Sequence, residues 1–360
     1  MTPKAGDTRQ APPKKAAAAT IYDVAKRVGV SPMTVSRVVN GDAKVRPATR
    51  AAVQKAMREL QFRPNKAARS LAGKAELRVG LLYNNPSTAY FIEFLMGALE
   101  SSGRNGVQLV VDKCTISDPD AAAAAIRKLV RGGINGIVLT APVSENAALI
   151  EELKSEGIGI VAVAMGAFRG NVTCVGIDDV RASYEMTKYL ASLGHKRLGF
   201  VVGHPAHSSS KLRLQGFEKA IKELGSEVEK PRIVQGHYSY RSGMEAGEEL
   251  LAGKQIPSAV FASNDDMASG VLSVAHRKGL DVPRDLSVTG FDDTIAGSLW
   301  PALTTIRQPI FDIASKATEV VVQNLREIRA GRSPECANHL VPHLLVVRES
   351  AAPLRSKTRV

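Results

Sequence analysis

Short clusters of amide and carboxylate side chains follow three apolar segments of this chain. They are Asn84 and Asn85 after RVGLLY, Asn264, Asp265 and Asp266 after SAVFAS, and Asp292 and Asp293 after LSVTGF. A basic pair, Lys211 and Arg213, lies between the first and second clusters. A planar guanidinium with carboxylate and amide groups suits multiple hydrogen bonds to vicinal hydroxyls or to a carboxylate. These residues therefore predict a small-molecule site where strands end.

The acidic residues also have a simpler interpretation, as helix caps. Asp265 and Asp292 precede helical or turn segments, where a carboxylate can accept hydrogen bonds from the first backbone amides. Asp265 can serve both purposes, whereas Asp266 and Asp293 are expected as caps or surface residues. The sequence leaves the two interpretations open.

Catalytic and metal-binding motifs are not found. The chain has no GxxxxGK[ST], GxGxxG, GxSxG or HExxH motif. His204 and His207 lie in a proline-containing loop without a neighbouring cysteine or acidic ligand, so no metal site is expected there. A Ser–His–Asp triad is not excluded by residue order, but nothing points to one. We predict no catalytic residue, no metal and no cofactor.

The elements that must position the polar clusters follow an alternating pattern from Arg78 onward. Runs of Val, Ile and Leu without polar alternation favour parallel strands buried on both faces, and helical patterns lie between them. The helices are expected at 89–103, 119–131, 145–156, 180–194, 210–224, 241–253, 266–279 and 311–330. The length favours two doubly wound lobes, with the boundary near Gly203–Ser210 and later crossovers near Phe291–Gly297.

A different pattern occupies residues 20–40, TIYDVAKRVGVSPMTVSRVVN. Thr20 can cap a first helix, Gly29 can end it, and Ser31 can cap a second helix that has Pro32 at its first position. Two short helices joined by a glycine turn are typical of a helix-turn-helix. A third helix is expected from Pro47 to about Leu60, which completes an all-α N-terminal domain.

The start of the second helix in such a motif reaches base edges in the DNA major groove. We expect Pro32, Met33, Ser36 and Arg37 at this position, with Arg37 suited to a bidentate contact with guanine or, alternatively, to a phosphate. Met33 can offer only apolar contacts, such as a thymine methyl. The residues expected to position the domain on phosphates are Thr20, Ser31, Asn40, Lys44, Arg46 and Thr49.

The charge distribution agrees with a nucleic-acid partner. The 360 residues carry a net charge of +13, of which residues 1–75 contribute +12 from 16 Lys or Arg and 4 Asp or Glu. A basic module on a near-neutral body favours binding of a polyanion. Residues 1–19 are expected to form a disordered arm, no segment is apolar enough to span a membrane, and no secretory signal is expected. Three separated cysteines fit a reducing, cytoplasmic setting.

Several segments resemble, in one register, the lactose/galactose repressor (LacI/GalR) family of bacterial transcription regulators. They are TIYDVAKRVGVSPMTVSRVVNG, VRPATRAAVQKAMRELQFRPNKAARSLAG, LGHKRLGFVVG, SNDDMASG, LSVTGFDD and LTTIRQP, which together cover about residues 20–348. The resemblance implies an α/β core of two lobes like a periplasmic binding protein, with an effector held between them. It also implies a dimer on a pseudo-palindromic operator. The expected divisions are an arm (1–19), a helix-turn-helix domain (20–64), a hinge helix and linker (65–77), the core (78–350) and a tail (351–360).

The resemblance also implies roles for individual residues. Leu71 matches the hinge leucine that wedges a base step in the minor groove, with Asn65 and Arg69 as partners for backbone or minor-groove atoms. Arg213, Asn264 and Asp292 match effector-binding positions, and Tyr238 matches an aromatic residue that stacks on the ligand. Tyr90 could act similarly, although ordinary packing is an equal interpretation for both tyrosines. The complete predicted effector set is Asn84, Tyr90, Lys211, Arg213, Tyr238, Asn264, Asp265 and Asp292.

These observations predict a repressor of carbohydrate-utilisation genes whose operator affinity changes when a sugar or sugar acid binds between the lobes. Its expected partners are double-stranded operator DNA, the effector and a second copy of the chain, and its expected location is the bacterial cytoplasm, on the nucleoid. The tail has no leucine heptad, so dimerisation is expected through the core lobes. The alternative is a cytoplasmic sugar-binding protein or sugar-acting enzyme with a basic anchoring head.

Overall fold

The computed structural model describes residues 19–39, 45–60, 62, 77–83, 85–113, 119–164 and 170–354. The chain divides into two compact units, Met1–Glu76 and Leu77–Val360. We call the helical part of the first unit the head and the second unit the core. None of the described helices has the length and apolar character needed to cross a membrane.

The described residues of the head form three helices, as predicted. They are α1 (Ile21–Val28), α2 (Pro32–Val39) and α3 (Pro47–Glu59). Gly29 ends α1 with a φ of 73°, a left-handed conformation that glycine adopts without steric cost. Apolar side chains from all three helices form one small cluster, whose buried members are Val24, Ala25, Val35, Val38, Val53 and Ala56.

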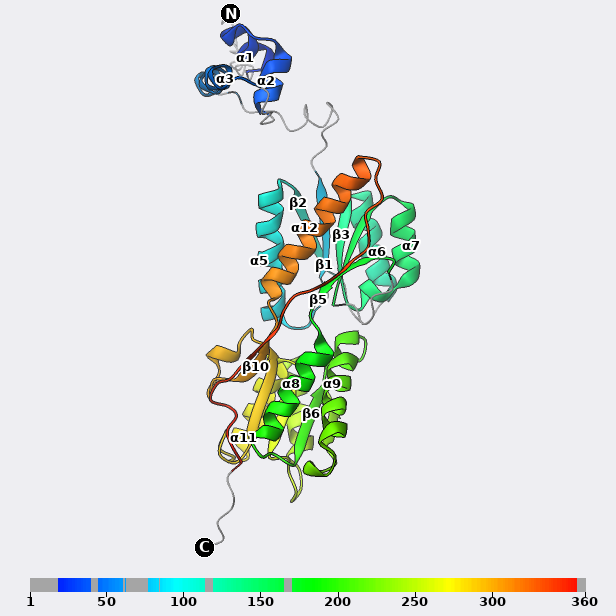
Figure 1. Cartoon of the computed structure of the whole chain (residues 1–360), viewed down its shortest axis with the longest axis vertical. Coiled ribbons are helices and arrows are strands. Elements are labelled where there is room, and N and C mark those ends of the chain that lie inside the picture. Colours follow the sequence, from blue (N-terminus) through cyan, green and yellow to red (C-terminus); the bar gives the residue numbers. More distant parts are fainter. Residues whose placement is uncertain are drawn as a thin grey trace, which may run out of the picture. The chain divides into compact units, whose positions relative to one another are not determined.

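The first lobe of the core is a parallel sheet covered by helices (Figure 1). Its strand order is β11-β5-β4-β3-β1-β2. The strands are β1 (Arg78–Tyr83), β2 (Gln108–Lys113), β3 (Gly136–Thr140), β4 (Gly159–Val163), β5 (Thr173–Gly176) and β11 (Asn338–Leu340). The helices are α5 (Thr88–Asn105), α6 (Pro119–Arg131), α7 (Ala147–Ser155) and α12 (Ile310–Arg329), with a short 3-10 helix, η1 (Val143–Glu145).

The two faces of this sheet belong to separate apolar clusters. Val138 and Val161 pack with residues of α5 and α12, whereas the alternate residues Ile137 and Ile160 pack with α6 and α7. This two-sided burial explains the unbroken apolar runs of the sequence. The helices α5 and α12 approach so closely at Gly97 that a Cβ there would overlap the carbonyl of Phe311.

The second lobe repeats this architecture, with strand order β12-β10-β9-β8-β6-β7. The strands are β6 (Leu198–Val202), β7 (Arg232–Gln235), β8 (Ala259–Ala262), β9 (Ser287–Asp292), β10 (Thr304–Arg307) and β12 (Leu344–Val346), the last antiparallel to β10. The helices are α8 (Asp179–Ser192), α9 (Ser208–Leu224), α10 (Tyr240–Leu250) and α11 (Asp265–Arg277), with η2 (Gly225–Glu227) and η3 (Ala296–Ser298). The predicted doubly wound, two-lobed fold is confirmed.

The predicted lobe boundaries were wrong. The chain passes between lobes at residues 177–178, 308–309 and 341–343. Gly203–Ser210 is instead the turn from β6 into α9, and Phe291–Gly297 leads from β9 to η3, so both stay within the second lobe. A polar break after a strand has the same local sequence character whether the chain continues in one sheet or leaves it, and only long-range strand pairing distinguishes the two.

The packed chain continues beyond Ser350 onto the second lobe. The amide of Leu354 donates to the carbonyl of Leu193 at 2.8 Å, and the carbonyl of Ala352 lies 3.0 Å from Nε2 of His195. The first residues of the predicted tail are therefore part of the core packing.

Candidate functional site

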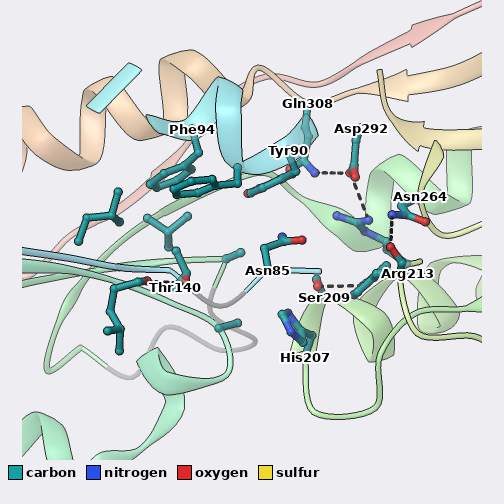
Figure 2. Close-up of a pocket in the computed structure, with 17 residues that line it drawn as sticks. Asn85, Tyr90, Phe94, Thr140, His207, Ser209, Arg213, Asn264, Asp292 and Gln308 are labelled. Carbon is teal, nitrogen blue, oxygen red and sulfur yellow. Dashed lines mark hydrogen bonds and ion pairs between the residues drawn. The ribbon is translucent and has the colours of Figure 1, made fainter. Parts of the chain in front are cut away.

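A pocket lies between the lobes, close to the carboxyl ends of the parallel strands (Figure 2). The first lobe contributes a mainly apolar wall, which includes Leu81, Leu82, Tyr90, Phe91, Phe94 and Val163. The second lobe contributes a polar wall, formed by His207, Ser209, Arg213, Tyr238, Asn264 and Asp292. Gln308 joins the polar wall from one of the chain crossovers. The pocket can therefore meet one apolar and one polar face of a ligand.

Arg213 is the centre of the polar wall and is only 5% exposed. Its Nε donates to Oδ1 of Asp179 at 2.8 Å, and its Nη1 donates to the carbonyl of Ser263 at 2.6 Å. The same Nη1 lies 3.5 Å from Oδ1 of Asp292. The guanidinium carbon lies 3.6 Å from the ring centroid of Phe291, a cation–π contact. Burial alone would lower the Arg213 pKa, but the two carboxylates raise it, so the side chain stays charged.

Asp292 is the second charged group that faces the pocket. Its Oδ1 accepts a hydrogen bond of 2.5 Å from Nε2 of Gln308. Burial raises the pKa of Asp292 to about 7, although Arg213 and Gln308 act in the opposite direction. Burial also raises the pKa of Asp179, against the effect of Arg213. One guanidinium therefore serves two buried carboxylates.

Backbone strain gathers at the same place. Among the described residues, the non-glycine residues with positive φ are Ala164, Tyr238, Asp292 and Asp293. Three of them line the pocket, and Asp293 adjoins it along the chain. Residues in this region cost free energy and persist where the surrounding structure holds them, often at ligand sites. Asp292, with a φ of 107°, is held between Arg213 and Gln308.

The rest of the polar wall is a set of hydrogen bonds around Tyr238. Its hydroxyl lies 3.1 Å from Oγ of Ser209 and 2.9 Å from Oγ of Ser210. Nδ2 of Asn264 donates to the backbone carbonyl of Tyr238 at 3.1 Å, while Oδ1 of Asn264 caps α11 by accepting from the amide of Met267. These bonds orient Ser209, Tyr238 and Asn264 in the pocket wall.

His207 differs from its neighbours because part of its hydrogen-bonding capacity is unused. The side chain is 5% exposed, and its Nε2 is buried without a hydrogen-bond partner among the described residues. Burial lowers the pKa of His207 to about 4, with smaller contributions from His204 and Arg213. The imidazole is therefore neutral near pH 7.

The two lobes also contact each other directly beside the pocket. Oγ of Ser87, at the start of α5, donates to Oδ2 of Asp266 in the second lobe at 2.6 Å. Oγ of Ser208 donates to the carbonyl of Ala164 in the first lobe at 3.3 Å. Asp266, expected as a cap or surface residue, is thus a bridge between lobes.

Five predicted effector residues line the pocket: Tyr90, Arg213, Tyr238, Asn264 and Asp292. Lys211 does not, because two positions along a helix place it about 200° around the axis from Arg213, on the exposed side of α9. Asp265 does not either. Its carboxylate is turned toward the sheet, where it accepts from the amide of Thr294 and the hydroxyl of Thr305. Asn84 lies outside the described residues.

The prediction of acidic helix caps was also wrong. Asn264, not Asp265, caps α11, and Asp292 lies at the end of β9 against Arg213 and Gln308. The side chain of Asp293 is 4% exposed and forms ion pairs with Arg307 and Arg348. A carboxylate at a strand end can bond forward along the chain or across to another element, and the local sequence does not distinguish these outcomes.

Sequence reasoning missed several pocket residues, namely Phe91, Phe94, His207, Ser209 and Gln308. A usable signal existed for Ser209, which precedes Arg213 by four residues and so shares its helix face. Asp179, which pairs with Arg213, also went unrecognised, because the two residues meet only when α8 packs on α9.

In the head, the described residues of the predicted DNA-binding set have the expected local roles. Oγ1 of Thr20 accepts from the amide of Asp23, whose carboxylate accepts from the amide of Thr20, a capping box at α1. These bonds lower the pKa of Asp23. Oγ of Ser31 accepts from the amide of Thr34 at the start of α2.

The outer side of α2 carries the predicted base-reading residues. Met33 is 64% exposed, and Arg37 is exposed one helical turn further along. Ser36 and Pro32 are half-buried between them, and Arg46 is exposed just before α3 with Thr49 half-buried in its first turn. The predicted contacts outside the described residues are Asn40, Lys44, Asn65, Arg69 and Leu71.

No metal centre is found in the parts of the chain that the structure describes, where no group of three or more His, Cys, Asp or Glu side chains could hold an ion. His204, His207 and His237 do lie together, with ring centroids 5.4 to 5.5 Å apart, but as edge-to-face contacts.

Comparison with known proteins relates both parts of the chain to one kind of molecule. Residues 20–65 match the model of bacterial regulatory proteins of the lacI family, and residues 187–351 match a periplasmic binding protein-like domain. The chain is 33% identical over 340 residues to the HTH-type transcriptional regulator DegA of Bacillus subtilis (strain 168), covering 94% of this chain and 99% of DegA. It is 32% identical to the catabolite control protein A of Priestia megaterium, covering 92% and 98% of the two chains.

Solved structures agree with these relatives. The lac repressor dimer bound to operator and the anti-inducer ONPF superposes with a TM-score of 0.76 at 27% identity, over 93% of this chain and 99% of the repressor chain. The complex of the transcriptional regulator CelR with cellobiose has a TM-score of 0.68 at 27% identity, over 92% and 99% of the chains. The named relatives are transcriptional regulators and not enzymes.

Proposed function

Because this chain belongs to the lacI family of bacterial regulatory proteins, we propose that it is a repressor of carbohydrate-utilisation genes. It binds a pseudo-palindromic operator as a homodimer, and a small sugar-like effector in the pocket between its lobes changes its operator affinity. The observation that carries this proposal is the combination of a basic helix-turn-helix head with a buried, polar-walled pocket in the core.

The head supports the DNA-binding part. Arg37 and Met33 are exposed on the second helix of the motif, where base edges are read, and Arg46 is exposed near the start of α3. Arg37 reads a guanine, Met33 contacts an apolar base feature, and Thr20, Ser31, Asn40, Lys44, Arg46 and Thr49 position the head on phosphates. We assign the wedge in the minor groove to Leu71, with Asn65 and Arg69 beside it.

The pocket supports the effector part. A ligand that contacts both lobes stabilises one relative arrangement of the lobes over others, and this preference can shift the population that binds DNA. Among the structural relatives, CelR is described in complex with cellobiose. The combination of an aromatic wall and a hydrogen-bonding wall suits such a ring-shaped saccharide.

Exposed apolar side chains support a homodimer through the core. Ile92, Met96 and Leu99 form a stripe on α5 at helical spacing, and each is 46% to 55% exposed. Trp300 in the second lobe is 89% exposed. Apolar surfaces on both lobes are the kind of surface that a partner subunit covers. The lac repressor relative is described as a dimer on its operator.

The test is selection of binding sites from random DNA by the purified full chain, at a fixed salt concentration because phosphate contacts make affinity salt-dependent. Enrichment of a pseudo-palindrome, followed by a change in affinity for it when a sugar is added, is the expected result. No enriched sequence with or without added sugars would contradict the proposal.

A truncated variant distinguishes the proposed regulator from the alternative, a sugar-binding protein or sugar-acting enzyme with a basic anchor. Removing residues 1–76 leaves the core, which has its own hydrophobic clusters. If the protein is a regulator, the truncated chain should lose operator binding, retain ligand binding and leave the ligand chemically unchanged. Chemical conversion of the sugar by the full chain would favour the alternative.

A further inference from the structure

We propose that the effector is an uncharged, hydroxyl-bearing ring molecule, one hydroxyl of which bonds Nε2 of His207, and that sugar acids and sugar phosphates are excluded from the pocket. This inference rests on the proposed function, because it assumes that the pocket holds the effector. It selects between the two ligand classes, neutral sugar and sugar acid, that the sequence leaves open.

The first argument is the charge balance of the pocket. Among the described residues that line it, Arg213 is the single Lys or Arg. Its guanidinium already pairs with Asp179 and contacts Asp292, both of which are buried. Lys211, the nearby lysine of α9, is exposed on another side of the helix. In the described lining, the one cation therefore already pairs with Asp179 and contacts Asp292, so a carboxylate or phosphate on the ligand would find no second cation among these residues to offset its charge.

The second argument is the state of His207. Its Nε2 is buried and unpartnered among the described residues, and His207 is one of the residues that line the pocket. An unsatisfied buried polar atom costs free energy, which a ligand recovers if it supplies the missing partner. Because the imidazole is neutral near pH 7, it offers no positive charge to an anion. A hydroxyl can donate or accept, so it satisfies Nε2 in either tautomer, whereas a carboxylate can only accept.

The third argument is the shape of the opposite wall. Tyr90, Phe91 and Phe94 present aromatic surface to the cavity, and the rings of Tyr90 and Phe94 lie 6.3 Å apart with an angle of 16° between their planes (Figure 2). Such a wall favours the C–H face of a saturated ring over a charged group, which would lose its hydration there. A neutral cyclic saccharide presents both an apolar face and hydroxyl edges.

The test compares matched ligands on the purified full chain. Isothermal titration calorimetry is run with neutral mono- and disaccharides, including cellobiose, glucose and galactose. The matched uronates and 6-phosphates of the monosaccharides are titrated beside them. We expect a neutral member to bind at least tenfold more tightly than its own uronate and phosphate. His207→Ala should weaken the binding of that neutral sugar by at least tenfold. His237 is an exposed histidine of the same cluster and lies outside the pocket, so His237→Ala should leave the affinity for the sugar unchanged.

The outcomes that overturn the inference are distinct from failure of the proposed function. A uronate or phosphate that binds as tightly as its neutral counterpart would overturn the charge argument. Unchanged affinity in His207→Ala would overturn the assigned hydroxyl contact, and a complete panel without any binding sugar would overturn the ligand class. The proposed function itself fails only if no operator is selected, or if a bound ligand leaves operator affinity unchanged.

Discussion

The head and the pocket use arginine in opposite ways. Arg37 is exposed on α2, at the surface where a base or phosphate is expected. Arg213 is buried on α9, between Asp179 and Asp292. A polyanion can approach the solvent-exposed side chain of Arg37, whereas Arg213 is enclosed and its charge is offset by two neighbouring carboxylates. The head is therefore suited to recognise charge, and the pocket to recognise hydrogen-bonding shape.

The two sites also differ in how the chain builds them. The described residues that are predicted to contact DNA come from two adjacent helices and the start of a third, between Thr20 and Thr49. The pocket takes single residues from both lobes and from a crossover, between Leu81 and Gln308. Substitutions in the head should accordingly affect DNA binding and the stability of the head itself, whereas substitutions in the pocket should affect core stability and ligand response together.

The largest expected effect is that of Arg213→Met. It leaves two buried carboxylates without their cation, and breaking a buried ion pair in this way costs roughly 3–5 kcal/mol of unfolding free energy. Urea denaturation followed by circular dichroism measures the loss. Lys211→Met, on the exposed side of the same helix, is the control and should change stability little. Equal stability of the two variants would show that Arg213 is not the internal counterion.

The pH dependence of core stability should come next in size. The folded-state pKa of Asp292 is about 7, above its unfolded value of about 3.9. The stability that protonated Asp292 contributes to the folded core is therefore fully present below about pH 4 and is lost as pH rises through 7. Relative to Asp292→Asn, the wild-type chain should lose on the order of 3 kcal/mol of stability between pH 4 and pH 8. Urea unfolding across this range measures the difference. Parallel pH profiles for the two proteins would contradict the assignment.

Arg37→Ala tests the other side of the comparison. Loss of a bidentate base contact should weaken binding to the selected operator by roughly 1–3 kcal/mol and relax specificity at one base pair. Core stability and sugar binding should not change, since the head has its own hydrophobic cluster. Titration of operator and scrambled DNA at one salt concentration measures this. An equal loss on both DNAs would assign Arg37 to phosphate instead.

The bridge between lobes predicts a smaller effect. Ser87→Ala and Asp266→Ala each remove the 2.6 Å bond across the lobes, and neither residue lines the pocket. A hydrogen bond to a charged group contributes about 1.5 kcal/mol, which corresponds to roughly a tenfold rise in the effector concentration needed for half response. Ser87 also caps α5, so a double-mutant cycle is required. Strictly additive effects would mean that the bond does not couple the lobes.

The smallest expected effect is that of Thr20→Ala, which removes the cap of α1. Loss of an N-cap costs about 1 kcal/mol and should be confined to the head. Hydrogen exchange of the α1 amides in the full chain measures the local loss, and Thr20→Ser keeps the hydroxyl as a control. Faster exchange throughout the core would contradict the independence of the head and the pocket.

Local patterns were sufficient for most of the described elements of this protein, although not for the short strands β5 and β10. The capping residues Thr20 and Ser31, the glycine turn and the apolar positions predicted the three head helices. Unbroken apolar runs predicted the parallel strands, and the helices between them were placed to within a few residues. These signals are readable because capping, turn geometry and burial periodicity each depend on residues close together in the chain.

Only the tertiary structure decided which polar residues act together. The sequence placed Asn264 and Asp292 near strand ends, and the family resemblance matched Arg213 to an effector-binding position. Neither could separate these residues from Lys211 and Asp265, whose side chains turn elsewhere. The sequence also could not show that Asp179 neutralises Arg213 or that Nε2 of His207 is left without a partner among the described residues. These properties depend on packing between elements far apart in the chain, where burial and the position of opposite charges set the chemistry of each group.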